Sequence, residues 1–100
     1  MTDRGEDTPL YSIAVAAELS GLTAAALRLY EEKGLVAPAR TDGGTRRYSE
    51  GDLSRLREIS RLQEDGINLA GIGRVIELQG ENDELRRRID DLEAPAAAEE

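Results

Sequence analysis

The chain has 100 residues, of which 34% are charged, and a formal net charge of −8 at pH 7. It contains no Cys and no His, which excludes thiol nucleophiles, imidazole acid–base catalysis and zinc fingers. One hundred residues make a single small domain, and aliphatic residues at helical spacing predict a mainly α-helical fold. We therefore expect no enzyme, no catalytic residue, no cofactor and no metal site.

The two ends of the chain differ from the rest in composition. Residues 1–10 are polar and acidic, which predicts a disordered tail, and residues 94–100 are expected to form a second, fraying tail. The N-terminus lacks the apolar core of a signal peptide, and no apolar run approaches the roughly 20 residues that a membrane span needs. We expect a cytoplasmic protein that does not associate with a membrane.

The first predicted helix begins near Tyr11 and ends at Gly21. Its predicted apolar face comprises Ile13, Val15, Ala16 and Leu19. Thr23 is a suitable N-cap for a second helix, which runs to about Lys33 and is terminated by Gly34. Two short helices joined by a tight turn that contains glycine are typical of a helix-turn-helix.

A basic hairpin is predicted directly after the second helix. Residues 36–40 and 45–48 form its arms, and Asp42-Gly43-Gly44 supplies the turn. Residues 28–61 contain eight basic and six acidic side chains, which makes this the net-positive section of an acidic chain. A helix followed by a basic, glycine-tipped hairpin is how a winged helix-turn-helix meets DNA, with the helix in the major groove and the hairpin along the phosphates.

The second helix is therefore the predicted recognition helix. Arg28 is expected to contact a base or a phosphate, although it could instead pair with Glu31 or Glu32 on the same helix. The hydroxyl of Tyr30 can donate to a phosphate while its ring packs under the hairpin. The expected DNA-contacting residues of this helix are Thr23, Ala24, Arg28, Tyr30 and Lys33.

The hairpin is expected to contact the DNA backbone. Successive strand residues point to opposite faces, so one of Arg46 and Arg47 meets phosphate while the other braces the hairpin, against Asp52 or Glu50. The sequence does not decide which arginine does which. Tyr48 either packs between the hairpin and the next helix or touches DNA. The expected DNA-contacting residues of the hairpin are Arg40, Arg46, Arg47 and Tyr48.

Two further capped helices are predicted. Ser49 and Asp52 form a capping box that starts a third helix, which runs to about Asp65. Its apolar stripe comprises Leu53, Leu56, Ile59 and Leu62. Asn68 caps a fourth helix, and the free N–H groups at the start of that helix are a further candidate phosphate site.

A heptad pattern closes the chain. The apolar positions and the single Asn of this pattern are Val75, Leu78, Asn82, Leu85, Ile89 and Leu92. We expect residues 11–78 to form the DNA-binding domain and residues 79–93 to form a separate helix after a break at Gly80. This helix is either a coiled coil that joins two protomers or a solvated helix that packs back on its own domain, and Asn82 either fixes the coiled-coil register or caps the helix. The arginines of residues 86–88 are expected to be a solvated face.

These motifs occur in a recognisable order. The segments LRLYEEKGLVAPART, GGTRRYS and DLSRL resemble the MerR family of winged-helix regulators over about residues 11–93. The resemblance implies a sequence-specific DNA-binding regulator, with DNA-facing roles at the matching positions Arg28, Tyr30, Arg40, Arg46 and Tyr48. Leu29 and Thr45 stand where the family often has tyrosine, so contacts attributed to those aromatic positions do not carry over.

Within that family, GINLAGIGRVIEL resembles the heat-shock repressor branch. The resemblance implies a homodimeric repressor of chaperone genes that binds an inverted repeat in double-stranded DNA, with the DnaK chaperone as a possible co-repressor. The chain ends soon after its heptad segment, so we do not expect a longer tail that meets a chaperone. We also expect no small-molecule ligand, because sensing members hold ligands beyond the coiled coil.

Three other readings remain open from the sequence. The chain could be an adaptor whose winged domain binds another protein, or an excisionase-like architectural DNA binder. As a regulator, it could activate transcription by distorting a promoter instead of repressing it.

Overall fold

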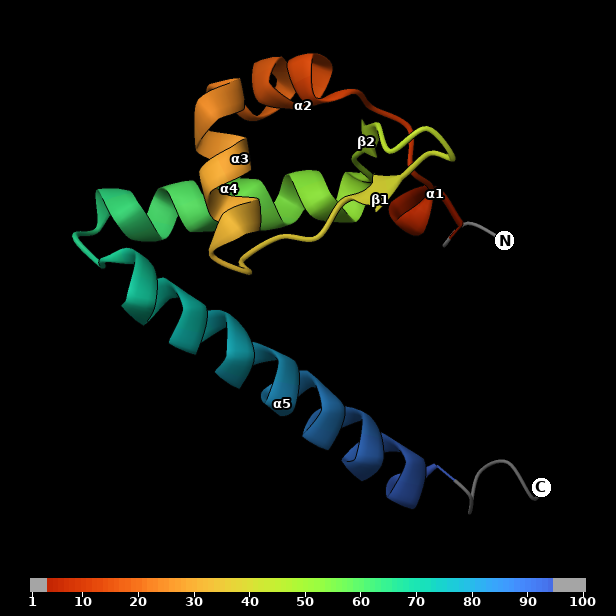
Figure 1. The fold of residues 1–100 in the computed structure, drawn as a ribbon. Coiled ribbons are helices and arrows are strands. Elements are labelled where there is room, and N and C mark those ends of the chain that lie inside the picture. Colours follow the sequence, from red (N-terminus) through yellow and green to blue (C-terminus); the bar gives the residue numbers. More distant parts are fainter. Residues whose placement is uncertain (1–3, 95–100) are drawn as a thin grey trace.

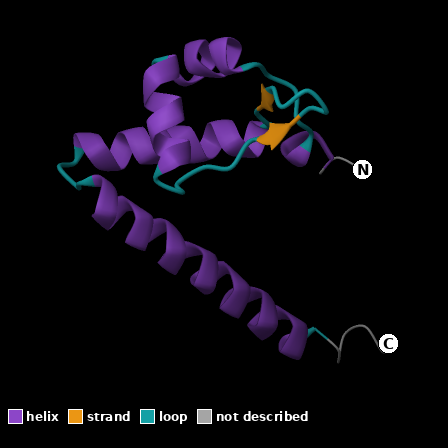
Figure 2. Ribbon diagram, viewed as in Figure 1, coloured by secondary structure: helices purple, strands orange, loops and turns teal. Residues whose placement is uncertain are grey.

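The computed structural model describes residues 4–94, so residues 1–3 and 95–100 of the two expected tails lie outside the described part. The elements in chain order are α1 (Arg4–Asp7), α2 (Ile13–Ser20), α3 (Ala24–Glu32), β1 (Ala39–Arg40), β2 (Arg46–Arg47), α4 (Glu50–Glu64) and α5 (Leu69–Glu93). Figure 1 shows α1, α2, α3 and the hairpin gathered around α4, while α5 leads away from them. The predicted class, mainly helical with one small antiparallel hairpin, is confirmed (Figure 2).

Three predicted helix starts are confirmed by their caps. The Thr23 hydroxyl accepts a hydrogen bond from the Ala26 N–H at 3.0 Å, and the Asn68 amide oxygen accepts one from the Gly71 N–H at 2.8 Å. Ser49 and Asp52 form both hydrogen bonds of the capping box, at 3.0 and 2.9 Å. Each cap satisfies N–H groups that the first helical turn leaves without an acceptor.

One apolar core joins α2, α3, the loop after α3, the end of the hairpin, α4 and the start of α5. Its buried members are Ala16, Ala17, Leu27, Tyr30, Leu35, Val36, Tyr48, Leu53, Leu56, Ile59, Leu62 and Ile72. The four predicted core positions of α4 are all among them. We call residues 4–76, which contain this core and the residues packed against it, the body.

The predicted apolar face of α2 is correct at Ala16 and Ile13 but wrong at Val15 and Leu19. The structure buries Ala16 and Ala17, whereas Val15 and Leu19 are 41% and 49% exposed. Because α2 packs against both α3 and α4, the face it buries is the one whose small side chains allow a close approach. Tertiary packing has overridden the hydropathy pattern here.

The structure also differs from the prediction that residues 1–10 are disordered. Residues Arg4–Asp7 form α1, which packs on the start of α4. The N–H of Tyr11 donates to the Tyr48 carbonyl at 2.9 Å, and the Tyr48 N–H donates to the Tyr11 carbonyl at 2.7 Å. Gly51 allows α1 to approach, since a Cβ there would lie 3.2 Å from the Glu6 carbonyl oxygen. Backbone pairing thus orders a segment whose side chains are polar.

The helix α5 runs without a break from Leu69 to Glu93. The predicted interruption at Gly80, and the predicted role of Asn82 as a cap after it, are therefore wrong. A glycine in a helix interior costs about 1 kcal/mol relative to alanine but keeps its N–H, so the hydrogen-bond ladder continues. The domain boundary that we placed after residue 78 falls inside one helix.

Within residues 4–94, no single helix has the length and apolar character to cross a membrane. The pair α2 and α3 meets both criteria only when taken together, with a bend of 102° between them, and both helices contribute to the core.

Candidate nucleic-acid interface

The predicted recognition helix, α3, presents a polar face to solvent. Leu27 and Tyr30, three residues apart, point into the core, and the two side chains between them are exposed. Arg28 is exposed, and it makes no ion pair with Glu31 or Glu32 among the described residues. Lys33, at the C-cap of the helix, is exposed as well. The predicted base-contacting side chain is therefore available.

Tyr30 is placed differently from the prediction that it contacts phosphate. Its side chain is 4% exposed, and its hydroxyl donates to Oε1 of Gln63 at 2.5 Å. Burial raises the pKa of the hydroxyl. Because the hydroxyl is already used to join α3 to α4, we remove Tyr30 from the candidate DNA contacts.

Tyr48 requires the same correction. The side chain is completely buried, so it cannot touch DNA, and burial raises its pKa. Its hydroxyl has no hydrogen-bond partner within the described residues. The residue anchors the end of the hairpin in the core instead.

The hairpin, which we call the wing (residues 39–47), has the predicted turn. Ala39 pairs with Arg47 and Arg40 pairs with Arg46 in an antiparallel register. The Thr41 N–H donates to the Thr45 carbonyl at 2.8 Å, which closes the turn. Gly44 has a φ of 87°, a left-handed conformation that glycine adopts without strain.

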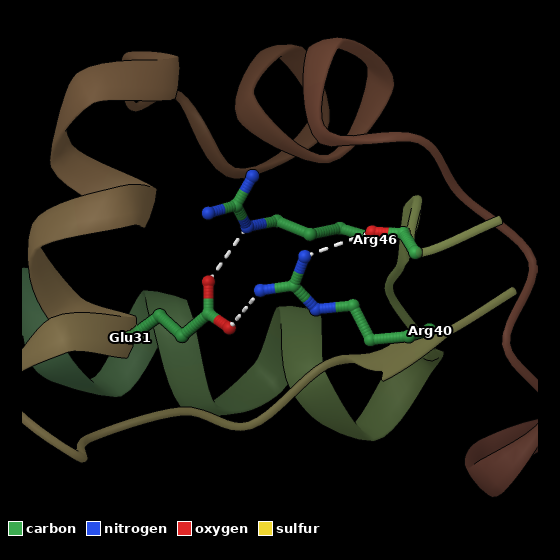
Figure 3. A network of polar contacts seen from close by, with 4 residues as sticks. Glu31, Arg40 and Arg46 are labelled. Carbon is green, nitrogen blue, oxygen red and sulfur yellow. Dashed lines mark hydrogen bonds and ion pairs between the residues drawn. The ribbon is translucent and has the colours of Figure 1, made fainter.

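The Glu31 carboxylate of α3 forms ion pairs with both strands of the wing (Figure 3). Oε1 of Glu31 lies 2.6 Å from Nε of Arg46, and Oε2 of Glu31 lies 2.7 Å from a terminal nitrogen of Arg40. The other terminal nitrogen of Arg40 donates to the Gly44 carbonyl at 2.9 Å. The hydrogen bonds from Arg46 and then Arg40 hold the pKa of Glu31 below its ordinary value, although burial opposes the shift.

This network shows which of the two neighbouring arginines, Arg46 or Arg47, braces the hairpin. Arg46 braces the hairpin, and its partner is Glu31; the expected partners, Asp52 and Glu50, are used elsewhere, in the α4 capping box and by the Tyr11 hydroxyl. Arg47 is half-buried and has no carboxylate partner among the described residues. Within the described residues, its guanidinium makes one long hydrogen bond, 3.4 Å to the Arg46 carbonyl. Arg47 is therefore the wing arginine whose guanidinium is available to bind a phosphate.

The sequence did not single out Glu31 as part of this site. From the sequence, Glu31 is only an alternative partner for Arg28, three residues away on the same helix. Its partners are 9 and 15 residues distant in the sequence. The detectable signal was the hairpin itself, because a turn at Asp42-Gly43-Gly44 brings Arg40 and Arg46 face to face and two facing cations need a carboxylate.

The remaining predicted phosphate site is at the start of α5. Asn68 is exposed, and its side chain caps the helix through the Gly71 N–H. The structure thus provides the exposed helix start that the prediction needs.

The far part of α5, residues 77–93, is exposed along its whole length; we call it the outer segment. The exposed fractions of its heptad side chains are 46% for Leu78, 56% for Leu85, 52% for Ile89 and 81% for Leu92.

Val75 is half-buried against the core, and Gln79 donates to Glu58 of α4 at 3.2 Å. Beyond Gln79 the helix does not pack back on its own domain (Figure 1). A shallow groove of about 440 Å³ follows this stripe, lined by Val75, Leu78, Gln79, Asn82, Asp83 and Arg86.

Comparison with known proteins gives consistent matches. A family model described as MerR HTH family regulatory protein matches residues 11–79. A Streptomyces coelicolor protein described as a candidate heat shock protein HspR is 53% identical over 90 residues, 89% of this chain and 60% of that protein. The HTH-type transcriptional regulator GlnR of Bacillus anthracis is 40% identical over 76 residues, 76% of this chain and 59% of GlnR. The chain thus spans about three-fifths of the length of these two relatives.

A solved structure is similar as well. It is that of HiNmlR, a MerR family regulator lacking the sensor domain, bound to promoter DNA. The TM-score is 0.68 and the sequence identity is 31%, over 87% of this chain and 67% of that one.

Proposed function

The chain belongs to the MerR family of helix-turn-helix regulatory proteins, and on that premise we propose that it is a homodimeric, sequence-specific DNA-binding regulator of transcription. The observation that carries the proposal is the pairing of an exposed Arg28 on α3 with a basic wing joined to the same helix through Glu31. HiNmlR, a similar structure, is bound to promoter DNA, which supports this assignment.

In the proposed complex, α3 enters the major groove. Arg28 contacts a base or a phosphate, and Thr23, Ala24 and Lys33 lie at the two ends of the same helix. The wing follows the neighbouring backbone, where Arg47 and the free donors of Arg40 and Arg46 meet phosphates. Asn68 and the first turn of α5 provide a further phosphate contact.

Two copies bind together through the outer segment. Its apolar stripe has heptad spacing and is not covered by its own chain, and a helix with such a stripe is stabilised by a second helix. The proposed interface comprises Val75, Leu78, Asn82, Leu85, Ile89 and Leu92. A two-fold symmetric dimer would recognise an inverted repeat.

The similarity to HspR supports a proposal for the regulated genes, namely those of the heat-shock response. At 53% identity over 90 residues, this relative supports a role as repressor in the heat-shock response. A regulator that acts on chromosomal DNA in a bacterium works in the cytoplasm, which is the location we propose.

Selection of genomic fragments by the purified protein tests this function. The protein is incubated with sheared DNA at two salt concentrations, and the retained fragments are sequenced. We expect an inverted repeat upstream of chaperone genes, with retention that falls steeply as salt rises because phosphate contacts release counterions. No enriched sequence at either salt concentration would overturn the proposal and favour a protein-binding adaptor, while bending of DNA without a defined repeat would favour an architectural role.

A further inference from the structure

One side chain of α3 holds both strands of the wing at the same position. Arg40 in β1 and Arg46 in β2 are register partners, and each donates to a different oxygen of Glu31 (Figure 3). The Glu31 and Arg46 side chains are only 22% and 26% exposed, which limits the screening of this pair by solvent. Movement of either strand relative to α3 would therefore break a charge-assisted hydrogen bond.

The wing has few other means of holding its orientation. Each strand has two residues, and an isolated hairpin of this size is marginally stable. Among the described elements, the extensive packing of each strand is against the other strand of the hairpin. The base of the wing is fixed by backbone pairing between Tyr48 and Tyr11, but this contact lies outside the turn end that would reach along DNA.

The same network controls how the wing arginines meet an anion. Two guanidinium groups share one carboxylate, so the three side chains carry a net charge of +1. No hydrogen bond or ion pair of the two terminal nitrogens of Arg46 is found in the described part of the chain, since its contact with Glu31 is made through Nε (Figure 3). A free arginine would bind phosphate in many poses, whereas an arginine held at Nε offers its remaining donors in one direction.

We propose that Glu31 is a positioning residue that fixes the wing relative to α3 and thereby sets DNA-sequence specificity. The inference rests on the proposed function, because it assigns Glu31 a role in the same DNA complex. With the wing fixed, its phosphate contacts form only when α3 is seated on the correct bases. With the wing released, the freed arginines bind any duplex.

The test compares Glu31→Gln with a matched control, Glu32→Gln, which removes the same charge from the adjacent, exposed position of α3. Affinity is measured for the selected repeat and for a random duplex of equal length, between about 50 and 200 mM salt. For Glu31→Gln we expect tighter binding to random DNA, a salt dependence steeper by about one phosphate contact or more, and a repeat-to-random affinity ratio reduced about tenfold. Glu32→Gln should raise both affinities alike and leave the ratio unchanged.

A second variant, Arg46→Lys, keeps the inference testable if Glu31→Gln does not fold. Arg46→Lys keeps the charge of the wing but loses the planar fork that reaches Glu31, so it should reduce the ratio without a gain in charge. An unchanged ratio in a folded Glu31→Gln or Arg46→Lys protein, or equal effects of Glu31→Gln and Glu32→Gln, overturns the inference while the proposed function stands. If the wild-type protein itself has no preference for any sequence, the proposed function fails and the inference fails with it.

Discussion

Leu56 in α4 and Leu92 near the end of α5 are the same residue type in helices of one chain, yet Leu56 is fully buried and Leu92 is 81% exposed. The body covers its own apolar side chains with elements from residues 4–76. The outer segment repeats apolar residues at heptad spacing and covers none of them. The body thus buries its apolar side chains through contacts within one chain, whereas the outer segment leaves its apolar stripe exposed, as the proposed dimer requires.

The two regions also differ in charge. Residues 77–93 contain seven acidic and three basic side chains, whereas the body as a whole is nearly neutral, with ten basic and eleven acidic side chains, and its central section, residues 28–61, contains eight basic and six acidic ones. An acidic helix is repelled by DNA phosphates, and a basic surface is attracted to them. The overall net charge of −8 is therefore unevenly distributed, and in the proposed complex the basic section of the body faces DNA while the acidic outer segment faces away from it.

The largest expected effect tests the body. Leu56→Ala should lower the free energy of unfolding by about 3 kcal/mol, because a buried leucine loses its contacts and leaves a cavity. Denaturant titration followed by circular dichroism measures this. The matched change Leu92→Ala, at chain concentrations low enough for monomers, should have little effect. Equal losses from the two variants would contradict the division between body and outer segment.

The next effect tests which region reads DNA. Arg28→Ala should weaken binding to the selected repeat by about 1–3 kcal/mol, since it removes a side chain from the groove-facing side of α3. Titration of labelled repeat DNA by fluorescence anisotropy gives the affinity. Arg87→Ala, at an exposed position of the outer segment, is the control and should change it little. An unchanged affinity for Arg28→Ala would show that α3 is not the recognition helix.

A gain of stability is expected in the outer segment. A Cβ at Gly80 would meet open space, and its φ is not in the left-handed region, so Gly80→Ala should stabilise α5 by up to about 1 kcal/mol. Gly34→Ala in the body should do the opposite, because Gly34 has a φ of +78°. Thermal melts of both variants measure the difference. A loss of stability for Gly80→Ala would mean that the helix is broken there in solution.

The smallest effect depends on pH. The pKa of Glu31 is lowered by its hydrogen bonds to Arg46 and Arg40, so its contribution to stability is fully present above the ordinary value of 4.5 and is lost as pH falls through the lower pKa of the folded state. Glu31→Gln removes this dependence. Below pH 4.5 the wild-type protein should therefore lose more stability than the variant, in unfolding titrations at matched ionic strength. Parallel losses in the two proteins would mean that the ion pairs do not hold in solution.

Local signals explain what the sequence could predict. Thr23, Ser49 and Asn68 cap their helices through residues at most three positions away, so their roles are readable in a short window. The glycine turn of the wing and the heptad spacing of α5 are similarly local. The exposed position of Arg28 follows from the spacing of Leu27 and Tyr30 on the same helix.

The predictions that the structure corrects concern residues whose positions depend on contacts between segments far apart in the sequence. Whether Ala17 or Val15 faces the core is decided by α3 and α4, which the pattern of α2 does not contain. Tyr30 is withdrawn from solvent by Gln63, 33 residues later in the chain. Glu31 joins the site only once the hairpin has brought Arg40 and Arg46 together. No window short enough to read by periodicity includes these pairs.

The stoichiometry of the protein on its selected repeat tests the division between body and outer segment most directly. Sedimentation velocity is run on the wild-type chain and on Leu85→Asp, each with and without the repeat DNA. We expect two wild-type chains per repeat and a dimer without DNA. The variant should be a folded monomer that binds a half-site weakly, because a charge cannot be buried in the apolar seam. One wild-type chain per repeat, or a persisting Leu85→Asp dimer, would contradict this division.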